Sequence, residues 1–158
     1  MGKKLTIIIL VIVVLFGALY FALNYKNNKA LEGDNPYGTT DLEQSTIDQL
    51  DDPLYGNQIL PDDLVERVES GEPTTVYFYS PECVYCQNTT PYLVPLTEEM
   101  DVDMKKLNLL EFGNEAAPFG IRSTPTLVHY EDGKEVARLE GQYAEEDYEK
   151  FFNEFVIK

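Results

Sequence analysis

The sequence predicts an α/β protein, with a mixed central sheet flanked by helices and one apolar membrane-spanning helix before it. Three observations support this prediction. The chain has 158 residues, 44% of them hydrophobic, which is enough for one domain of ordinary size. An uncharged apolar run extends from residue 5 to residue 23. From residue 59 onward, segments typical of helices and strands alternate in the order helix, strand, helix, strand, helix, strand, strand, helix.

The apolar run, residues 5–23, is long enough to cross a membrane, since as a helix it would measure about 28 Å. A secretory signal has a shorter apolar region that ends in small residues, whereas the best cleavage candidate here, Tyr20 to Ala22, begins with a bulky side chain. A buried core helix is the other alternative, but it normally carries polar positions on one face. We expect an uncleaved signal anchor, with residues 1–4 as a cytoplasmic tail.

Charge divides the chain at the end of this run. Lys and Arg number 12 against 28 Asp and Glu, and four of the cations precede the first acidic residue, Glu32. From residue 31 onward, eight cations face all 28 acidic residues, a net charge of −20. Such acidity argues against nucleic-acid binding, which requires cations to displace counterions from phosphate. The short amino-terminal tail with its lysines favours an extracytoplasmic domain in a cell membrane crossed once.

Residues 24–58 are expected to be an extracytoplasmic tether. The stretch from Gly33 to Thr40 is dense in turn-forming residues. Leu42, Ile47 and Leu50 are too sparse to define a helix. We therefore expect the folded domain to begin at residue 59.

The first half of the domain, from residue 59, contains two predicted helices around a buried strand. Pro61 starts the first helix, which ends at Ser70 and Gly71. Residues 74–79 are rich in β-branched and aromatic side chains, as in a buried strand. After the break at residues 80–82, a helix is expected from about Cys83 to Met100.

The second half is predicted to contain a strand, a short helix, a hairpin and a final helix. The strand covers 102–109 and the short helix 114–119. Two strands, 126–130 and 135–139, flank a turn that contains Asp132 and Gly133. The last helix is defined by five bulky residues that share one face: Tyr148, Phe151, Phe152, Phe155 and Val156.

Cys83 and Cys86 are three residues apart where a strand passes into a helix. A sulfur at the start of a helix lies where unpaired N–H groups and the helix dipole stabilise a thiolate, and the second sulfur is one turn further in. This spacing suits exchange between a dithiol and a disulfide. A zinc site shares the spacing but needs a second pair of ligands, for which the sequence offers only His129. An inert structural disulfide is the remaining alternative.

Several spaced features extend this pattern. Pro91 follows Cys86 by five residues, and the segment 119–127 contains the sequence Ser-Thr-Pro-Thr, in which the proline is Pro125. Lys106 lies in the second predicted strand and Gly141 precedes the last helix. With these features, residues 59–158 resemble the thioredoxin superfamily, and the resemblance implies a thioredoxin-like fold.

The resemblance also implies roles for individual residues. Cys83 would attack a substrate disulfide or accept attack from a substrate thiol, and Cys86 would resolve the mixed disulfide. Pro125, in the cis form, would pack beside the sulfurs, while the backbone of Thr124 would pair with an extended substrate peptide. Tyr85 is the best candidate for a tyrosine at the substrate groove. The redox-active disulfide Cys83–Cys86 would be the working group, with no cofactor and no metal.

The sequence departs from cytosolic thioredoxins around the cysteines. Glu82 stands where they have Trp, and Val84-Tyr85 stands where they have Gly-Pro. Tyr77 occupies the position of their buried Asp, whose partner lysine is retained as Lys106. Since a tyrosine is no base near neutral pH, the Cys86 proton is expected to pass to water, Glu82 or another carboxylate.

These features together predict a membrane-tethered thiol–disulfide oxidoreductase that acts on cysteine-containing exported proteins, with a membrane redox partner. The departures favour an oxidase or isomerase. An extracytoplasmic reductase, for example in haem-protein maturation, is the alternative within this class, because the charge of Glu82 raises the pKa of Cys83. The alternative outside the class of enzymes is a thioredoxin-like module that binds client proteins without turnover.

Overall fold

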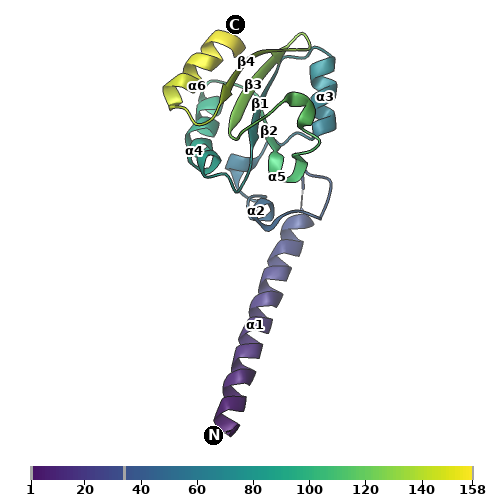
Figure 1. Ribbon diagram of the computed structural model, residues 1–158, viewed down its shortest axis with the longest axis vertical. Helices are drawn as coiled ribbons and strands as arrows, with labels where there is room; N and C mark the ends of the chain where they lie inside the picture. Colours follow the sequence, from purple (N-terminus) through teal and green to yellow (C-terminus); the bar gives the residue numbers. More distant parts are fainter. Residues whose placement is uncertain (1, 34, 158) are drawn as a thin grey trace. The chain divides into compact units, whose positions relative to one another are not determined.

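The computed structural model describes residues 2–33 and 35–157 of the chain. It divides into two compact units, Met1–Asn35 and Pro36–Lys158. The first unit is essentially one helix, and the second contains the sheet (Figure 1).

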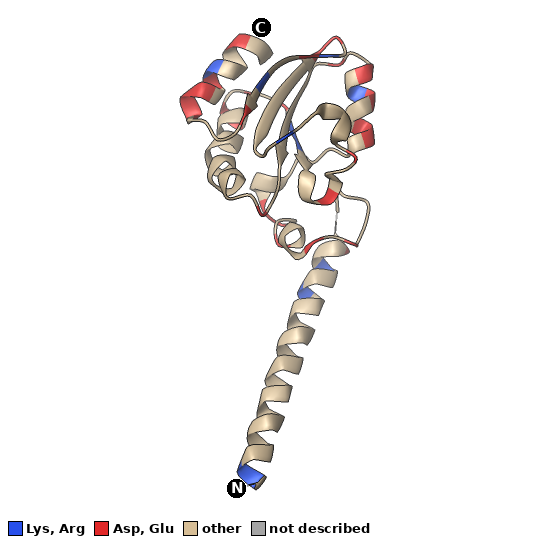
Figure 2. Cartoon of the chain, in the orientation of Figure 1, with Lys and Arg blue, Asp and Glu red and all other residues tan. Residues whose placement is uncertain are grey.

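The first unit consists of helix α1, Gly2–Leu31. Its large apolar side chains between Leu5 and Leu23 are exposed. The helix is long and apolar enough to cross a membrane, judged by length and composition. Lysines lie towards both of its ends (Figure 2). The helix continues past the predicted limit at residue 23 through a polar stretch, since residues such as Lys29, Ala30 and Leu31 favour helical backbone.

The second unit is built on a four-stranded sheet of order β2-β1-β3-β4. Strand β1 pairs parallel with β2 and antiparallel with β3, and β3 pairs antiparallel with β4. The predicted mixed sheet flanked by helices is therefore confirmed (Figure 1). The strands are β1 Thr74–Tyr79, β2 Met104–Asn108, β3 Thr126–Glu131 and β4 Lys134–Glu140.

Helices cover both faces of the sheet, with α4 and α6 on one side and α3 on the other (Figure 1). The three are α3 Pro61–Glu69, α4 Val84–Glu99 and α6 Glu145–Phe151, which continues as a π-helix, η3, over Phe152–Val156. The shorter helical segments are α2 Gln44–Ile47, η1 Pro53–Tyr55, α5 Leu109–Phe112 and η2 Ala117–Phe119.

Two predicted elements in the middle of the second unit differ from those of the structure. The strand expected over 102–109 ends at Asn108, and the chain turns helical at once in α5. The cause is local, because the Asn108 side chain accepts a hydrogen bond from the Leu110 N–H at 3.0 Å and caps the new helix. The helix predicted over 114–119 is reduced to the short turn η2.

The core is divided between the two faces by the alternation of side chains along β1, all six of whose residues are buried. Tyr77 and Tyr79 point to the side covered by α4 and α6, which we call the tyrosine face. Val76 and Phe78 point to the side covered by α3 and η2, which we call the phenylalanine face. Cys86 belongs to the core of the tyrosine face.

Residues 36–58, which the sequence analysis assigned to the tether, pack within the second unit as its N-terminal segment. Tyr37 and Thr46 are buried, and the Tyr37 ring stacks on Phe112 with centroids 6.0 Å apart. Gln58 forms a parallel bridge to Lys106 and so extends the sheet beyond β2. The second unit therefore begins at Pro36, and its N-terminal segment is held by the buried side chains of Tyr37 and Thr46 and by the bridge from Gln58 to the sheet edge.

Candidate active site

Cys83 lies at the end of a tight turn between β1 and α4. Its N–H donates to the Ser80 carbonyl at 3.1 Å, and the Gln87 side chain donates to the Pro81 carbonyl at 2.7 Å, which fixes the turn. Cys83 is the N-cap residue of α4, and its Sγ accepts a hydrogen bond from the Cys86 N–H at 3.3 Å. The structure thus places the first sulfur at the start of the helix, as the sequence predicted.

The environment of Cys83 stabilises its thiolate. Partial burial raises the pKa of the Cys83 thiol, but hydrogen bonds with Cys86 and Thr124 and with the N–H groups of Cys86 and Tyr85 outweigh this effect. The net result is a pKa lowered from the ordinary value. Cys83 is also half-buried and so open to a partner. A sulfur with these properties is a nucleophile.

Cys86 has the opposite character. It is 1% exposed, and burial, with a further contribution from the hydrogen bond with Cys83, raises its pKa to about 12. At neutral pH the group is therefore a thiol. The structure describes both cysteines as free thiols.

The loop before β3 meets Cys83. The peptide bond between Thr124 and Pro125 is cis, and the Cys83 thiol donates to the Thr124 carbonyl at 3.3 Å. The Pro125 carbonyl accepts from the Gly141 N–H at 2.7 Å, which ties the loop to the end of β4. The structure thus brings together Cys83, Cys86, Thr124 and Pro125, four of the residues selected from the sequence.

Tyr85 and Glu82 lie at the surface on either side of Cys83. The Tyr85 side chain is 58% exposed, as is that of Val84, so the residues between the cysteines form an apolar surface beside the reactive sulfur. The Glu82 carboxylate accepts a hydrogen bond from the Ser45 hydroxyl at 3.2 Å. The N-terminal segment therefore reaches the residue that precedes Cys83, a contact that the sequence did not suggest.

Lys106 and Tyr77 are neighbours in the sheet but have separate partners. They are paired in the register of β1 and β2, yet the Lys106 ammonium donates to the Gly56 carbonyl at 2.9 Å. Lys106 is 4% exposed, and burial lowers its pKa to about 8. The Tyr77 hydroxyl lies 3.3 Å from the Thr90 hydroxyl, and burial raises the Tyr77 pKa far above its usual range.

Two residues near Cys86 were missed from the sequence. Thr90 lies one turn after Cys86, and its hydroxyl donates to the Cys86 carbonyl at 2.9 Å. The four-residue spacing on a helix could have identified it. Tyr55, at the end of η1, packs against the same cluster as Cys86, and no local pattern in the sequence indicated this contact.

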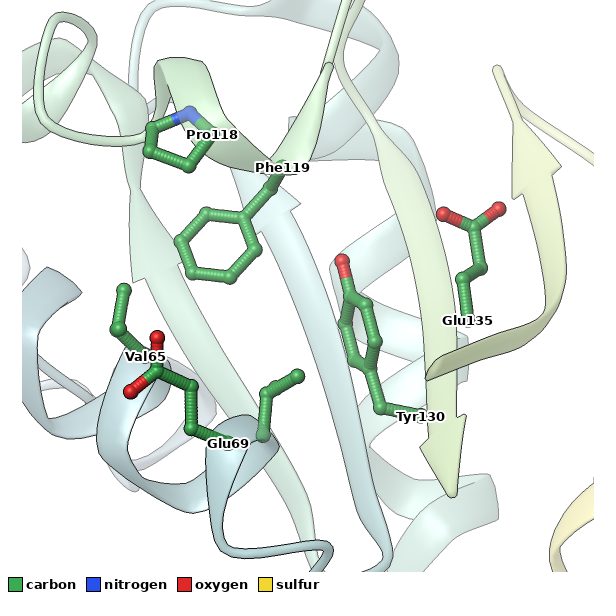
Figure 3. Close-up of a pocket in the computed structure, with 7 residues that line it drawn as sticks. Val65, Glu69, Pro118, Phe119, Tyr130 and Glu135 are labelled. Carbon is green, nitrogen blue, oxygen red and sulfur yellow. The ribbon is translucent and has the colours of Figure 1, made fainter. Parts of the chain in front are cut away.

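A separate hollow lies on the phenylalanine face, away from the cysteine core (Figure 3). It has a volume of about 330 Å³ and is bounded by residues of α3, η2 and the β3–β4 hairpin, among them Val65, Phe119 and Tyr130. The buried Tyr130 hydroxyl has no hydrogen-bond partner among the residues described. Within 2–33 and 35–157, no three His, Cys, Asp or Glu side chains are grouped to hold a metal ion. His129 instead bonds to the Thr75 hydroxyl at 2.9 Å.

Comparison with known proteins decides the family. The family model described as Thioredoxin matches residues 59–154. The chain belongs to the thioredoxin family. Within this family it is a redox protein, and its thioredoxin relatives support a thiol–disulfide oxidoreductase.

The relatives are named thioredoxins. The chain is 26% identical over 113 residues to the thioredoxin of Porphyra purpurea, over 70% of this chain and 98% of that protein. It is 36% identical over 81 residues to the thioredoxin of Chlamydia muridarum, over 51% of this chain and 78% of that protein. The crystal structure of Chlamydomonas reinhardtii thioredoxin f2 aligns with a TM-score of 0.56 and 25% identity, over 64% of this chain and 96% of that one.

Proposed function

We propose that this thioredoxin-family chain is a membrane-tethered thiol–disulfide oxidoreductase that acts outside the cytoplasm. Its substrates would be cysteine-containing exported proteins, with which it exchanges disulfides through Cys83 and Cys86. Helix α1 supports the tether, since it is apolar, exposed and long enough to span a membrane. The strongly acidic remainder of the chain fits a solvated domain better than a surface that binds polyanions.

The observation that carries the proposal is the placement of the two thiols, with Cys83 half-buried at the N-cap of α4 and Cys86 buried one turn further in, which agrees with a lowered pKa for Cys83 and a raised one for Cys86. In oxidation, a substrate thiolate attacks Cys83 of the Cys83–Cys86 disulfide, and Cys86 leaves and takes up a proton. A second substrate thiolate then attacks the substrate sulfur of the mixed disulfide and releases the Cys83 thiolate. The substrate loses two electrons to the cysteine pair, and a membrane redox partner would reoxidise the pair.

The same residues would hold the substrate. The backbone of Thr124 lies beside the Cys83 sulfur, where it would pair with an extended peptide, and Pro125 offers no competing N–H. The exposed ring of Tyr85 would contact apolar side chains next to the substrate cysteine.

The oxidising or isomerising direction is favoured by the stabilised Cys83 thiolate, because stabilising the reduced form makes a couple more oxidising. A reductase is the second candidate, because the relatives are ordinary thioredoxins. The reduction potential of the full chain against glutathione separates the two directions. A reduction potential of about −270 mV, the thioredoxin range, would overturn the oxidase assignment.

Trapping tests the proposal itself. In cells, a full-length Cys86→Ala variant should accumulate mixed disulfides with exported proteins, because the resolving thiol is absent. A Cys83→Ala, Cys86→Ala double variant is the control and should accumulate none. Unchanged client binding by the double variant, without mixed disulfides in the single one, would instead support a module that binds without turnover.

The location is tested by labelling Cys83 on intact cells with a membrane-impermeant maleimide. The Cys86→Ala variant serves here, since it leaves Cys83 as the one cysteine of the chain. Labelling before lysis is expected. Labelling only after lysis would place the domain in the cytoplasm and refute the extracytoplasmic part of the proposal.

A further inference from the structure

The hollow on the phenylalanine face has the size and the walls of a small-molecule site. Five apolar side chains form its walls: Val65 and Val68 of α3, Pro118 and Phe119 of η2, and Tyr130 of β3 (Figure 3). Its volume, about 330 Å³, is at the lower end of the range found for pockets that enclose small organic molecules. The hollow can therefore hold one compact molecule against two aromatic rings.

One polar group belongs to this hollow and lacks a partner. Tyr130 is 5% exposed, and its hydroxyl has no hydrogen-bond partner among residues 2–33 and 35–157. The hydroxyl end of the side chain is directed towards Phe119, among the other side chains of the lining (Figure 3). Burial raises the Tyr130 pKa above its usual value, so the hydroxyl is neutral at neutral pH and can both donate and accept. Because an unpaired buried hydroxyl costs free energy, a ligand that supplies a hydrogen-bond partner recovers this free energy on binding.

The walls are held in place by contacts within the chain. Arg138 of β4 donates to the Phe119 carbonyl at 3.2 Å and to the Gly120 carbonyl at 3.4 Å, and its guanidinium also pairs with Glu135. One side chain thus ties β4 to the end of η2. The Phe119 and Tyr130 rings meet edge to face, with centroids 6.1 Å apart. The hollow is therefore preformed, as binding sites for small molecules usually are.

Charge at the edge of the hollow favours a cation. Glu69 of α3 and Glu135 of β4 are both exposed and border the hollow (Figure 3). Glu135 is neutralised by Arg138, whereas Glu69 forms no ion pair with any residue that the structure describes. Helix α3 carries four acidic residues against one cation, Arg67, which pairs with Glu72 (Figure 2). A ligand with positive charge at this edge would therefore meet an uncompensated carboxylate.

We propose that this hollow is a binding site for a small aromatic amine. The ring of the amine packs against Phe119 and Tyr130, a hydrogen-bonding substituent of the ring contacts the Tyr130 hydroxyl, and the ammonium group lies at the edge beside Glu69. The site sets this orientation, because the neutral hydroxyl is buried and the carboxylate is exposed. A lysine or arginine side chain of a partner protein would instead enter with its charge first and bring that charge to the apolar end. Neither cysteine takes part, so the site goes beyond the proposed function, which stands even if the site is absent.

The experiment titrates the full chain, in detergent micelles and with ¹³C-labelled valine methyl groups, with tyramine and with 2-phenylethylamine. Tyramine carries a ring hydroxyl that 2-phenylethylamine lacks. Saturable shifts of the Val65 and Val68 methyl resonances are expected, with tyramine bound about fivefold more tightly because its hydroxyl pairs with that of Tyr130. Val84, which is exposed beside the cysteines, reports non-specific association and should show no saturable shift.

Tyr130→Phe retains the ring and should abolish the preference for tyramine. The ratio of the two affinities is compared between wild type and variant, because this comparison cancels the partition of each amine into micelles. The variant should fold, since it loses a hydroxyl that has no partner among the residues described. A preference of unchanged size in the variant would overturn the contact with the Tyr130 hydroxyl and, with it, the proposed orientation.

Glu69→Gln tests the ammonium group and should weaken tyramine binding about threefold, the effect of an exposed ion pair. Glu66→Gln is the matched control: it removes an exposed carboxylate of the same helix that is not among the residues lining the hollow, and it should leave the affinity unchanged. Equally tight binding of 3-(4-hydroxyphenyl)propionate, an anion of similar shape, would refute the preference for a cation. Tighter binding of N-acetyllysine amide, or titrations without saturable shifts at Val65 and Val68, would overturn the assignment of the hollow to a small aromatic amine.

Discussion

The two faces of the sheet use the same strand for different purposes. On the phenylalanine face, Val76 and Phe78 meet apolar side chains such as Leu64 and Phe119. On the tyrosine face, Tyr77 and Tyr79 alternate with them, and their rings stack 5.9 Å apart. These four residues of the six in β1 are fully buried, so the two faces differ in chemistry and not in exposure.

Tyr77 and Tyr79 require hydrogen-bond partners that Val76 and Phe78 do not, because a buried hydroxyl without a hydrogen bond costs free energy. Tyr77 finds its partner in Thr90 of α4. Tyr79 finds its partners in Gln58 and Tyr37 of the N-terminal segment. The face that contains Cys86 is thus completed by residues 36–58, and we expect the phenylalanine face to contribute primarily to stability.

The largest expected effect concerns the phenylalanine face. Phe78→Ala removes a fully buried ring that lies 5.6 Å from the ring of Phe119, and it should lower the free energy of unfolding by about 3–5 kcal/mol. Urea unfolding of the full chain in micelles measures this loss. The rate at which the thiols of the reduced chain react with dithiobis(nitrobenzoate) should remain that of the wild type under conditions where the variant is folded.

Tyr77→Phe is the counterpart on the tyrosine face. It keeps the ring and removes one hydroxyl, so the free energy of unfolding should fall by only about 1 kcal/mol. A folded Phe78→Ala variant whose thiols reacted more slowly than those of the wild type would contradict the division between the two faces.

The second prediction concerns Lys106, at the edge of the sheet next to β1. Its pKa in the folded chain, about 8, is below the ordinary lysine value, so between pH 8 and 10.5 the unfolded chain binds more protons than the folded one. Stability contributed through this group must then rise with pH across that window. Comparing wild type with Lys106→Met, the stability difference should shift in favour of the wild type by about 2 kcal/mol from pH 7.5 to 9.5.

Taking the difference in stability between wild type and Lys106→Met cancels the contributions of the cysteines and tyrosines, because these groups titrate in both proteins. Lys105→Met is the control, since the Lys105 ammonium contacts Asp103 at 3.1 Å and is less deeply buried. A pH-independent difference between wild type and Lys106→Met would show that Lys106 is not desolvated by the segment that covers it.

The sequence predicted the parts of the fold that depend on local pattern. The four strands, the three longer helices and the positions of both cysteines followed from breakers, side-chain alternation and family resemblance. Residues 36–58 could not be predicted in this way, because their contacts join positions far apart in the chain. The hydrogen bond from Asn108 to Tyr37 spans 71 positions, and that from Gln58 to Tyr79 spans 21. A segment with few apolar residues can still be ordered when it packs against the edge of a sheet that is already formed.

The smallest expected effect tests this attachment at Tyr79. The Tyr79 hydroxyl accepts from the Gln58 side chain at 2.8 Å and lies 3.3 Å from the Tyr37 hydroxyl. Tyr79→Phe keeps the stacked rings but removes both contacts, which should cost about 1 kcal/mol of global stability. The loss should be concentrated in residues 36–58, whose proteolysis in the native protein should accelerate about fivefold, as a local opening made easier by about 1 kcal/mol requires.

Tyr143→Phe, at a position 39% exposed, provides the matched control and should leave the cleavage rate unchanged. If cleavage in residues 36–58 did not accelerate in Tyr79→Phe, the segment would be held by its apolar contacts alone. The hydroxyls of the tyrosine face would then contribute nothing to the attachment of this segment. Accelerated cleavage in Tyr79→Phe and not in Tyr143→Phe would show that the hydrogen bonds of Tyr79 contribute to the attachment of residues 36–58 to the sheet.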